Sequence, residues 1–135
     1  DSLLLSLLRG RRLSNLPRQV LVHLCHSAER SGDYAQVRNT VEVLTEQGWT
    51  EWDGFACRWA TSSSWGAVAY WNVLYLIEEL PISSQKKAEQ LRQINQLVGA
   101  KKIKIQNGFW PAAEIQKYLD KWDQAAQAEG EENHG

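Results

Sequence analysis

Apolar side chains recur at intervals of three and four along most of this 135-residue chain, which is the period of one face of an α-helix. Serine, asparagine or aspartate precedes most of these periodic segments, and glycine or proline follows most of them, as expected at helix ends. The predicted helices lie near residues 2–9, 16–30, 33–47, 51–60, 64–80, 83–98 and 111–128. The sequence therefore predicts an all-α single domain of about six or seven helices, arranged as a bundle or a short solenoid-like stack.

The chain divides into a predicted domain and a short tail. Residues 1–128 are expected to form the all-helical domain, and residues 129–135 a disordered acidic tail. Within the domain, residues 101–106 alternate lysine with isoleucine or glutamine, which predicts a brief extended piece. No other segment offers an obvious partner strand, which argues against a sheet. The chain begins with Asp1 instead of methionine, so we expect a fragment of a longer protein.

Composition and charge exclude several classes of protein. Hydrophobic residues make up 43% of the chain and charged residues 23%, which is typical of a globular domain. A net charge of -1 gives no overall field that attracts nucleic acid or membrane. No apolar run reaches the roughly 18 residues of a membrane span, so no membrane partner is expected. Cys25 and Cys57 lack metal-ligand spacing, which predicts free thiols and an intracellular location, cytoplasmic or nuclear.

No motif in the chain predicts catalysis, a metal or a cofactor. His23 and His26 are three residues apart on a predicted helix, but no third ligand lies nearby in sequence. Arg58 is placed to lower the pKa of the adjacent Cys57 thiol if both face one cleft, yet no Cys/His signature surrounds them. Phosphate loops, dinucleotide fingerprints and nucleophile elbows are absent from the sequence. We therefore predict a protein that is not an enzyme.

Tryptophan is concentrated in the middle of the chain, where it must form a core, a binding groove, or both. Three aromatic residues on or beside the most apolar predicted helix are expected in the core: Trp65, Trp71 and Tyr75. A segment of weaker helical character alternates indoles with charged residues, as in an interface where aromatic anchors are rimmed by charge. The predicted partner-binding residues are Trp49, Trp52, Phe55, Arg58 and Trp59. Arg58 is the candidate to pair with an acidic group of the partner.

Basic residues beside aromatic residues support a second hypothesis. Single-stranded nucleic acid is bound by such sets, because phosphates meet the cations and bases stack on the rings. The candidate residues are Arg9, Arg11, Arg12, Lys101, Lys102, Lys104, Phe109 and Trp110. The balanced net charge of the whole chain weighs against this hypothesis.

Residues 21–48 resemble one helical hairpin of the tetratricopeptide family, and the related pentatricopeptide repeats share the two-helix plan. The tripeptide Gly32-Asp33-Tyr34 forms the expected turn, and Leu24 with the small Cys25 falls where the family places its Leu-Gly pair. The resemblance covers one repeat, and Arg58 stands where a second repeat would carry leucine. It implies an interaction surface and no reaction.

These observations together predict a non-enzymatic protein–protein interaction module, an adaptor or scaffold domain that binds a helix or peptide in an aromatic-lined groove. RNA or single-stranded nucleic-acid binding is the alternative. A leucine stripe on the first predicted helix is a further candidate contact, through which the chain would associate with itself. That stripe consists of Leu3, Leu4, Leu7 and Leu8.

Overall fold

The computed structural model describes the backbone of residues 2–10, 16–62 and 66–134, and the side chains of residues 4–10, 16–62 and 66–130. Regular secondary structure within these residues is helical, which confirms the predicted all-α single domain. The helices are α1 (Ser2–Leu8), α2 (Arg18–Arg30), α3 (Tyr34–Glu46), α4 (Phe55–Ser62), α5 (Tyr70–Glu79), α6 (Ser84–Gly99) and α7 (Ala112–His134), with the 3-10 turn η1 (Gln106–Gly108) before α7.

Local capping signals set the ends of α3 and α6 where the sequence predicts them. Asp33 accepts hydrogen bonds at 3.1 and 3.4 Å from two backbone N–H groups in the first turn of α3, which have no partner inside the helix. Ser83 caps α6 in the same way, through a contact of 3.2 Å. Beyond α3, Gly48 has a φ of 85°, the left-handed conformation that glycine adopts at low cost.

The helix predicted near residues 51–60 begins later, at Phe55. Gly54 has a φ of 73°, and the N–H of Phe55 donates to the carbonyl oxygen of Trp52 at 3.1 Å. The preceding residues therefore form a turn instead of the first turn of a helix. A positive φ cannot continue a right-handed helix, so Gly54 fixes where α4 starts.

A backbone bridge delays the start of α5, which begins at Tyr70 and not near residue 64. The N–H of Val68 donates to the carbonyl oxygen of Lys104 at 3.1 Å, and the carbonyl oxygen of Val68 accepts from Gln106 at 2.8 Å. The extended piece predicted at residues 101–106 thus has a partner after all, in the connection before α5. This pairing links two connections that are far apart in sequence.

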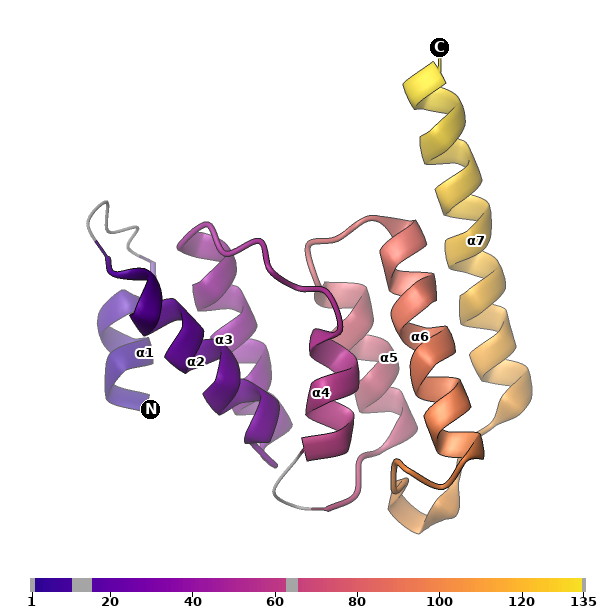
Figure 1. The fold of residues 1–135 in the computed structure, drawn as a ribbon, viewed down its shortest axis with the longest axis horizontal. Coiled ribbons are helices and arrows are strands. Elements are labelled where there is room, and N and C mark those ends of the chain that lie inside the picture. The colour runs from indigo at the N-terminus through magenta and orange to yellow at the C-terminus, as the bar shows by residue number, and fades with distance from the viewer. Residues whose placement is uncertain (1, 11–15, 63–65, 135) are drawn as a thin grey trace.

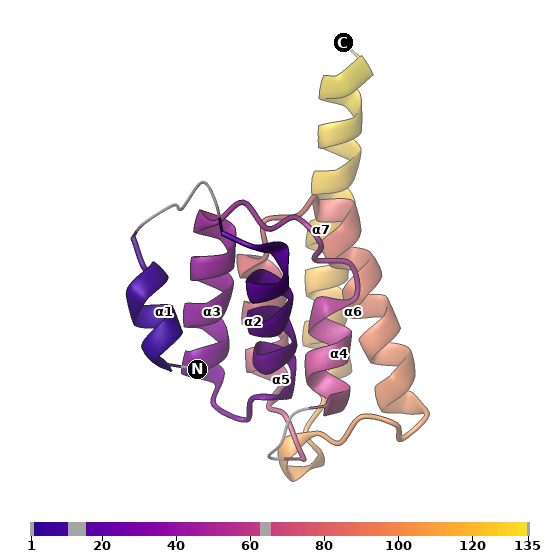
Figure 2. The same cartoon turned by 60° about the vertical axis from the view of Figure 1, so that its left-hand side comes forward.

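The helices pack in two layers. In Figure 1, α2, α4 and α6 lie side by side nearer the viewer, and α3 and α5 lie behind them. Each helix packs on helices one or two places away in the chain: α2 on α3 and α4, α4 on α5 and α6, and α6 on α5 and α7. Figure 1 shows α1, which packs on α3, at one end of the stack and α7 at the other, and the turned view in Figure 2 again has α1 at the left-hand edge.

A continuous apolar core lies between the layers. Its largest fully buried side chains are Trp52, Trp59, Trp122, Phe55, Leu8, Leu24, Leu44, Leu74, Leu76, Ile77, Leu80 and Leu91. Each aromatic residue of this kind removes about 150–250 Å² of surface from water, which makes the rings a large part of the stabilisation. The core joins all the helices from α1 to α7.

The last helix extends beyond the body of the stack (Figure 1). The sequence predicts a disordered tail from residue 129, whereas the structure continues α7 to His134. Gly130 lies at the predicted boundary, but it is not among the glycines with a positive φ, so the helical backbone passes through it.

Candidate functional site

The tryptophan-rich segment lies inside the core. The exposed fractions are 9% for Trp49, 1% for Trp52, 0% for Phe55 and 2% for Trp59. The prediction that these rings line an open groove is therefore wrong. Phe55 and Trp59 are four residues apart on α4, a spacing that puts them on one face, and the ring of Trp52 in the preceding turn packs against Phe55. The turn before α4 and α4 itself direct this face toward the neighbouring helices α2 and α6.

Local hydrogen bonds and ring contacts hold the buried indoles. Nε1 of Trp52 donates to the carbonyl oxygen of Trp49 at 3.0 Å, and Nε1 of Trp59 donates to the carbonyl oxygen of Ser31 at 3.1 Å. The rings of Trp52 and Phe55 meet edge to face, with centroids 5.3 Å apart. A buried indole N–H without an acceptor costs about 1–3 kcal/mol. These acceptors therefore allow the two indoles to serve as core residues.

Arg58 is already paired within the chain. Its Nε donates to Oε1 of Glu29 at 2.7 Å, and its Nη1 donates to the carbonyl oxygen of Asp53 at 2.8 Å. The Glu29 side chain is only 8% exposed, against 48% for Arg58. The guanidinium predicted to meet a partner's acidic group instead neutralises a buried carboxylate of α2. None of the five predicted partner-binding residues is thus a free anchor at the surface.

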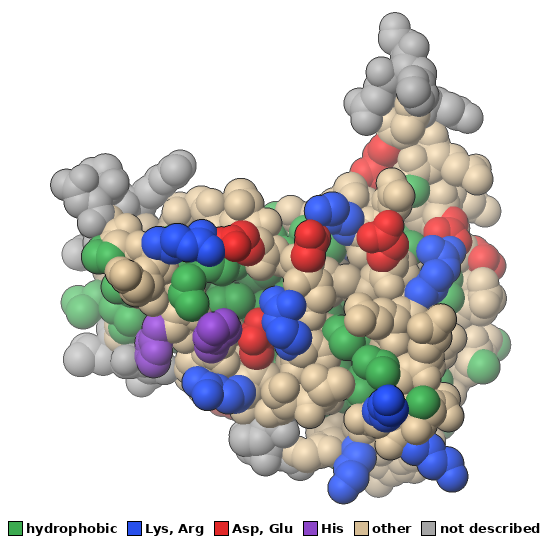
Figure 3. Space-filling model, viewed as in Figure 1, with side chains coloured by type: hydrophobic (Ala, Val, Ile, Leu, Met, Phe, Trp, Pro, Cys, Tyr) green, Lys and Arg blue, Asp and Glu red, His purple; other side chains and the backbone are tan. Residues whose placement is uncertain are grey.

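The basic residues predicted to bind nucleic acid lie at two ends of the stack. Arg9 follows α1, and its guanidinium lies 3.9 Å from a carboxylate oxygen of Glu42 on α3. The segment after α6 carries the other described cations: Lys101, Lys102 and Lys104. In Figure 3, Lys and Arg side chains gather at the lower right, over the connection between α6 and α7. Arg11 and Arg12 lie outside the described residues.

Phe109 and Trp110, the aromatic residues predicted beside these lysines, differ in exposure. Phe109 is 56% exposed. Trp110 is partly buried, and its Nε1 donates to Oδ1 of Asn95 at 2.9 Å. Only Phe109 therefore presents a widely open ring next to the lysines.

Three of the four large apolar side chains that the described residues leave exposed lie in one region. The exposed fractions are 44% for Trp71, 52% for Tyr75 and 56% for Phe109. Tyr70 connects two of them, because its ring meets the rings of Trp71 and Phe109 edge to face, with centroids 5.3 Å apart in both cases, and Tyr75 lies one helical turn beyond Trp71 on α5. Tyr70, Trp71, Tyr75 and Phe109 are hereafter the aromatic surface. Sequence reasoning missed this surface as a unit.

The prediction that Trp71 and Tyr75 belong to the core is wrong. The two residues are four apart on α5, so they share one face of the helix. The other side of α5 buries Val73, Leu74, Leu76 and Ile77. A helix that is apolar all round does not mark its outer face in the sequence, since hydrophobic periodicity needs polar positions for contrast. Trp65, predicted in the core as well, lies outside the described residues.

Glu78 joins α5 to α7 beside the aromatic surface. Its carboxylate accepts hydrogen bonds from Nζ of Lys121 and from Nε1 of Trp122, both at 2.8 Å. Partial burial opposes ionisation of this carboxyl, but the hydrogen bonds from Lys121 and Trp122 outweigh burial and lower the pKa of Glu78. The negative charge of Glu78 is therefore paired with groups of the same chain.

Two further carboxylates border the rings, and each has a partner. Glu79 accepts a hydrogen bond at 3.0 Å from Nε of Arg38, and a second nitrogen of that guanidinium lies 2.9 Å from its other oxygen. Burial and then a hydrogen bond with Glu114 raise the pKa of the Tyr70 hydroxyl. The negative charges around the aromatic surface are thus compensated or hydrogen-bonded.

Neither thiol is activated as a nucleophile. Burial, followed by the nearby carboxylate of Glu29, raises the pKa of Cys25 to about 12. Burial also raises the pKa of Cys57, and this effect exceeds the opposing effect of Arg58. The lowering of the Cys57 pKa that the sequence suggested is therefore reversed, because the thiol lies in the core. The thiolate is the reactive form of cysteine, so both groups are poor nucleophiles near neutral pH.

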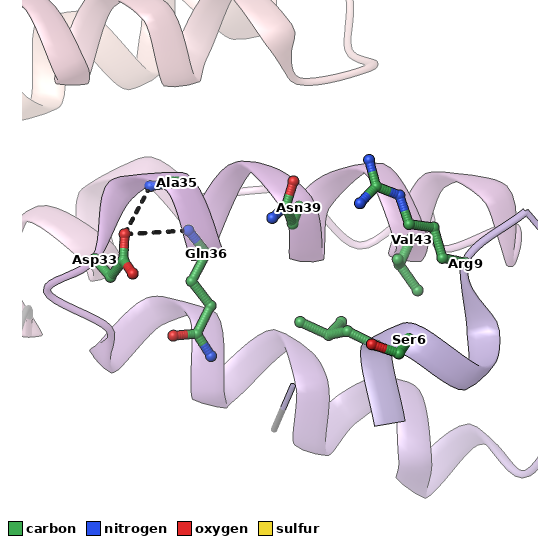
Figure 4. Close-up of a pocket in the computed structure, with 8 residues that line it drawn as sticks. Ser6, Arg9, Asp33, Ala35, Gln36, Asn39 and Val43 are labelled. Atoms are coloured by element: carbon green, nitrogen blue, oxygen red, sulfur yellow. Dashed lines mark hydrogen bonds between the residues drawn. The ribbon is translucent and has the colours of Figure 1, made fainter. Parts of the chain in front are cut away.

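A hollow of about 290 Å³ lies between α1 and α3 (Figure 4). Its lining residues are Leu5, Ser6, Arg9, Asp33, Ala35, Gln36, Asn39 and Val43. The carboxylate of Asp33 already accepts the two hydrogen bonds that cap α3. The remaining lining residues include no acid–base pair, so this hollow offers no recognisable catalytic arrangement.

His23 and His26 lie on α2 with exposed side chains. Within the described residues, no group of three or more His, Cys, Asp and Glu side chains is placed to hold a metal ion. Across the same residues, no helix combines the length and the apolar character that a bilayer crossing demands.

Comparisons of the chain with protein-family models, with curated proteins and with solved structures give no match. The resemblance of residues 21–48 to a tetratricopeptide hairpin therefore stays a prediction.

Proposed function

We propose that this chain is a non-enzymatic protein–protein interaction module that receives a helix or short peptide on the aromatic surface. The exposure of Trp71, Tyr75 and Phe109 in one region is the observation that carries the proposal. Large aromatic side chains are enriched among the residues that contribute most to protein interfaces. An adaptor or scaffold role is the interpretation that fits a surface of this kind, since the residues that the structure describes form no recognisable reaction centre.

The aromatic surface has a rigid base, which supports its use in binding. Trp71 and Tyr75 project from α5, whose opposite side is part of the core. The ring of Phe109 rests on Tyr70. Rings held in place before binding lose little conformational freedom when a partner arrives, so more of the contact energy appears as affinity.

The free thiols of Cys25 and Cys57 fit an intracellular setting.

A capture experiment with variants of the surface tests the proposal. We expect the wild-type domain to retain a set of cellular proteins that Trp71→Ala and Phe109→Ala no longer retain. Gln93→Ala is the matched control, because Gln93 is exposed on α6 and lies beside Asp53 and Gly54, outside the aromatic surface. Melting temperatures measured for all variants separate lost binding from lost folding. An unchanged set of captured proteins for folded Trp71→Ala would contradict the proposal.

Single-stranded nucleic-acid binding is the second candidate, and the exposed Lys101, Lys102 and Lys104 before the open ring of Phe109 favour it. A labelled oligothymidylate titrated at increasing salt tests this candidate. Binding through three phosphates would weaken with a log–log slope of about −2. Absence of binding at low salt would eliminate it.

Self-association through α1 is a narrower proposal than the sequence indicated. Leu5 and Leu8 are 8% and 2% exposed in the core, so Leu7 is the α1 leucine with a widely open side chain among those described. Sedimentation of wild type and Leu7→Asp over a range of concentrations tests it. Equal masses for both proteins would exclude α1 as a contact.

A further inference from the structure

The connection after α6 presents lysines in a fixed arrangement. Lys102 and Lys104 are exposed, whereas the intervening Ile103 is 4% exposed and belongs to the core. Alternate side chains of an extended segment point to opposite sides, so the buried isoleucine directs both lysines outward. None of the ion pairs formed by the described residues includes Lys101, Lys102 or Lys104. Their charges are available to another molecule.

The bridge at Val68 places these lysines next to the aromatic surface. The carbonyl oxygen of Lys104 accepts a hydrogen bond from Val68 at 3.1 Å, and Tyr70 follows Val68 by two residues, or at most about 7 Å of chain. On the other side of the bridge, the ring of Phe109 meets the ring of Tyr70 edge to face, with centroids 5.3 Å apart. The cations and the rings therefore form one continuous surface with two chemically different ends.

The uncompensated charge on this surface is positive. The carboxylates at the opposite end, Glu78 and Glu79, accept from Lys121, Trp122 and Arg38 within the chain. From Lys101 to Lys121 the sequence carries five lysines and two acidic residues, Glu114 and Asp120. A partner that complements the surface thus brings acidic groups to the lysines and apolar groups to the rings.

The position of the carboxylates favours a peptide over a nucleic acid. A polynucleotide repeats its phosphate at every base, so a strand that stacked along all the rings would carry phosphates past Glu114, which is hydrogen-bonded to Tyr70 and belongs to none of the ion pairs of the described residues. A peptide can confine its acidic residues to one end and place aliphatic or aromatic side chains on Trp71 and Tyr75. The net charge of -1 likewise supplies no long-range attraction for a polyanion.

We infer that the partner is an acidic segment of another protein with apolar anchors, whose carboxylates contact Lys102 and Lys104 while its apolar side chains cover Trp71 and Phe109. This inference rests on the proposed function, because it names the chemistry of the partner that the aromatic surface receives. The lysines supply orientation and the rings supply contact area.

A designed peptide tests the inference directly. The probe is a labelled synthetic peptide with a run of glutamates followed by an amphipathic leucine-containing stretch, and its control is the same peptide with glutamine for every glutamate. We expect the acidic peptide to bind the intact chain about tenfold more tightly than the glutamine peptide. Raising the salt concentration should weaken the acidic peptide alone.

Variants of the protein separate the two parts of the surface. Lys102→Gln with Lys104→Gln should weaken the acidic peptide about tenfold and leave the glutamine peptide unchanged. Trp71→Ala should weaken both peptides. Lys86→Gln is the matched control, because Lys86 is exposed at the other end of α6 and pairs with Asp53 at 3.0 Å. This control should bind both peptides as the wild type does.

The contrary outcomes point to different failures. Equal affinity for both peptides with a loss in Trp71→Ala overturns the acidic partner and leaves the interaction module standing. If Trp71→Ala binds both peptides with the affinity of the wild type, both proposals are overturned. Oligothymidylate binding in place of peptide binding overturns both in favour of nucleic acid. A concentration-dependent mass abolished by Trp71→Ala assigns the surface to a second copy of this chain, and no binding of the acidic peptide at low salt overturns the inference.

Discussion

At the scale of single residues, Glu29 shows how one buried charge constrains its surroundings. Its carboxylate is held by Arg58 at 2.7 Å, and Arg58 in turn lies against Gly54, where an added Cβ would be 2.9 Å from Nη1 of the guanidinium. The φ of 73° therefore favours glycine at position 54, and a side chain there would also displace the guanidinium of Arg58.

Arg58→Leu should lower the free energy of unfolding by roughly 1–3 kcal/mol, because it leaves the Glu29 carboxylate buried and unpaired. Urea denaturation measures this loss. The double variant Glu29→Leu with Arg58→Leu should recover most of it, since no buried charge then lacks a partner. If the double variant were less stable than Arg58→Leu alone, the buried charge would not be the cause.

Cys25 should make stability sensitive to alkaline pH. Its pKa is raised from an ordinary value of 9.0 to about 12, so the unfolded thiol ionises at a lower pH than the folded one. The contribution is fully present below pH 9.0 and is lost as the pH rises toward about 12. Urea denaturation from pH 8 upward should show a shallower decline for Cys25→Ala than for wild type, by up to about 1 kcal/mol per pH unit. Parallel declines would contradict this.

At the scale of helices, Gln90 is a connection that sequence reasoning missed. Its side chain is 5% exposed on α6. The Oε1 atom accepts from the backbone N–H of Ala56 at 3.0 Å, and Nε2 donates to the carbonyl oxygen of Trp52 at 2.9 Å. Gln90 thus satisfies one of the free N–H groups in the first turn of α4 from a different helix.

Gln90→Leu should destabilise the fold by about 1–3 kcal/mol, because the buried N–H of Ala56 loses its acceptor, while the carbonyl oxygen of Trp52 keeps its hydrogen bond from Phe55. Thermal and urea unfolding measure the change. Gln93→Leu is the control, since Gln93 lies on the same helix with an exposed side chain and should change stability by less than about 0.5 kcal/mol. Similar losses in the two variants would mean that the bonds to α4 contribute little.

Glu78 links three helices and should respond to acid. The Glu78 carboxylate accepts hydrogen bonds from Lys121 and Trp122 of α7. Its backbone carbonyl oxygen also accepts one from Nζ of Lys87 on α6, at 2.7 Å. The lowered pKa means that its stabilisation is present above the ordinary value of 4.5 and is lost as pH falls below it.

Glu78→Gln should therefore reduce the free energy of unfolding by about 1 kcal/mol at neutral pH, a modest figure because the carboxyl is partly exposed. The difference from wild type should shrink as the pH falls below 4.5. Unfolding followed at several pH values measures it. A difference that stayed constant with pH would assign the loss to packing and not to charge.

At the scale of the whole molecule, aromatic area is divided between an interior and an outer face. Trp52, Trp59 and Trp122 lie in the core, whereas Trp71 is 44% exposed. The division follows from the two-layer packing, because α4 is covered by α2, α5 and α6, while α5 keeps one side open.

Trp59→Ala should cost about 3–5 kcal/mol of stability, as expected for a large buried ring. Trp71→Ala should cost less than about 1.5 kcal/mol, because much of its ring is in water in the folded state. Paired urea unfolding curves give both values. Equal costs would show that Trp71 packs as tightly as Trp59 and would remove the basis of the aromatic surface.

Much of the fold could be predicted from local signals, but the outer face could not. Asp33, Gly48 and Ser83 mark helix ends by their own chemistry, so no knowledge of the rest of the molecule is needed. The starts of α4 and α5 depend on tertiary contacts, such as the pairing of Val68 with the segment after α6. Those contacts link residues far apart in sequence, which a local pattern does not report.

The candidate site was harder to predict because composition does not distinguish a buried indole from an exposed one. The charged residues around Trp52 suggested a surface, yet Arg58 there serves a buried carboxylate. The apolar sequence around Trp71 suggested a core, yet one face of α5 has no covering helix among the described residues. The lysines after α6, Arg9 and Phe109 have the exposure that the sequence implied.

The packing of each helix on helices one or two places away in the chain has a consequence for biosynthesis. Contacts between close neighbours in sequence form with little loss of chain entropy, which favours rapid folding. The pair α2 and α3 can pack together as soon as both have left the ribosome. Each later helix can then pack on helices that have already folded. Val68 must wait for Lys104 and Gln106, which are synthesised only after α6, and Glu78 must wait longer still, for Lys121 and Trp122 of α7.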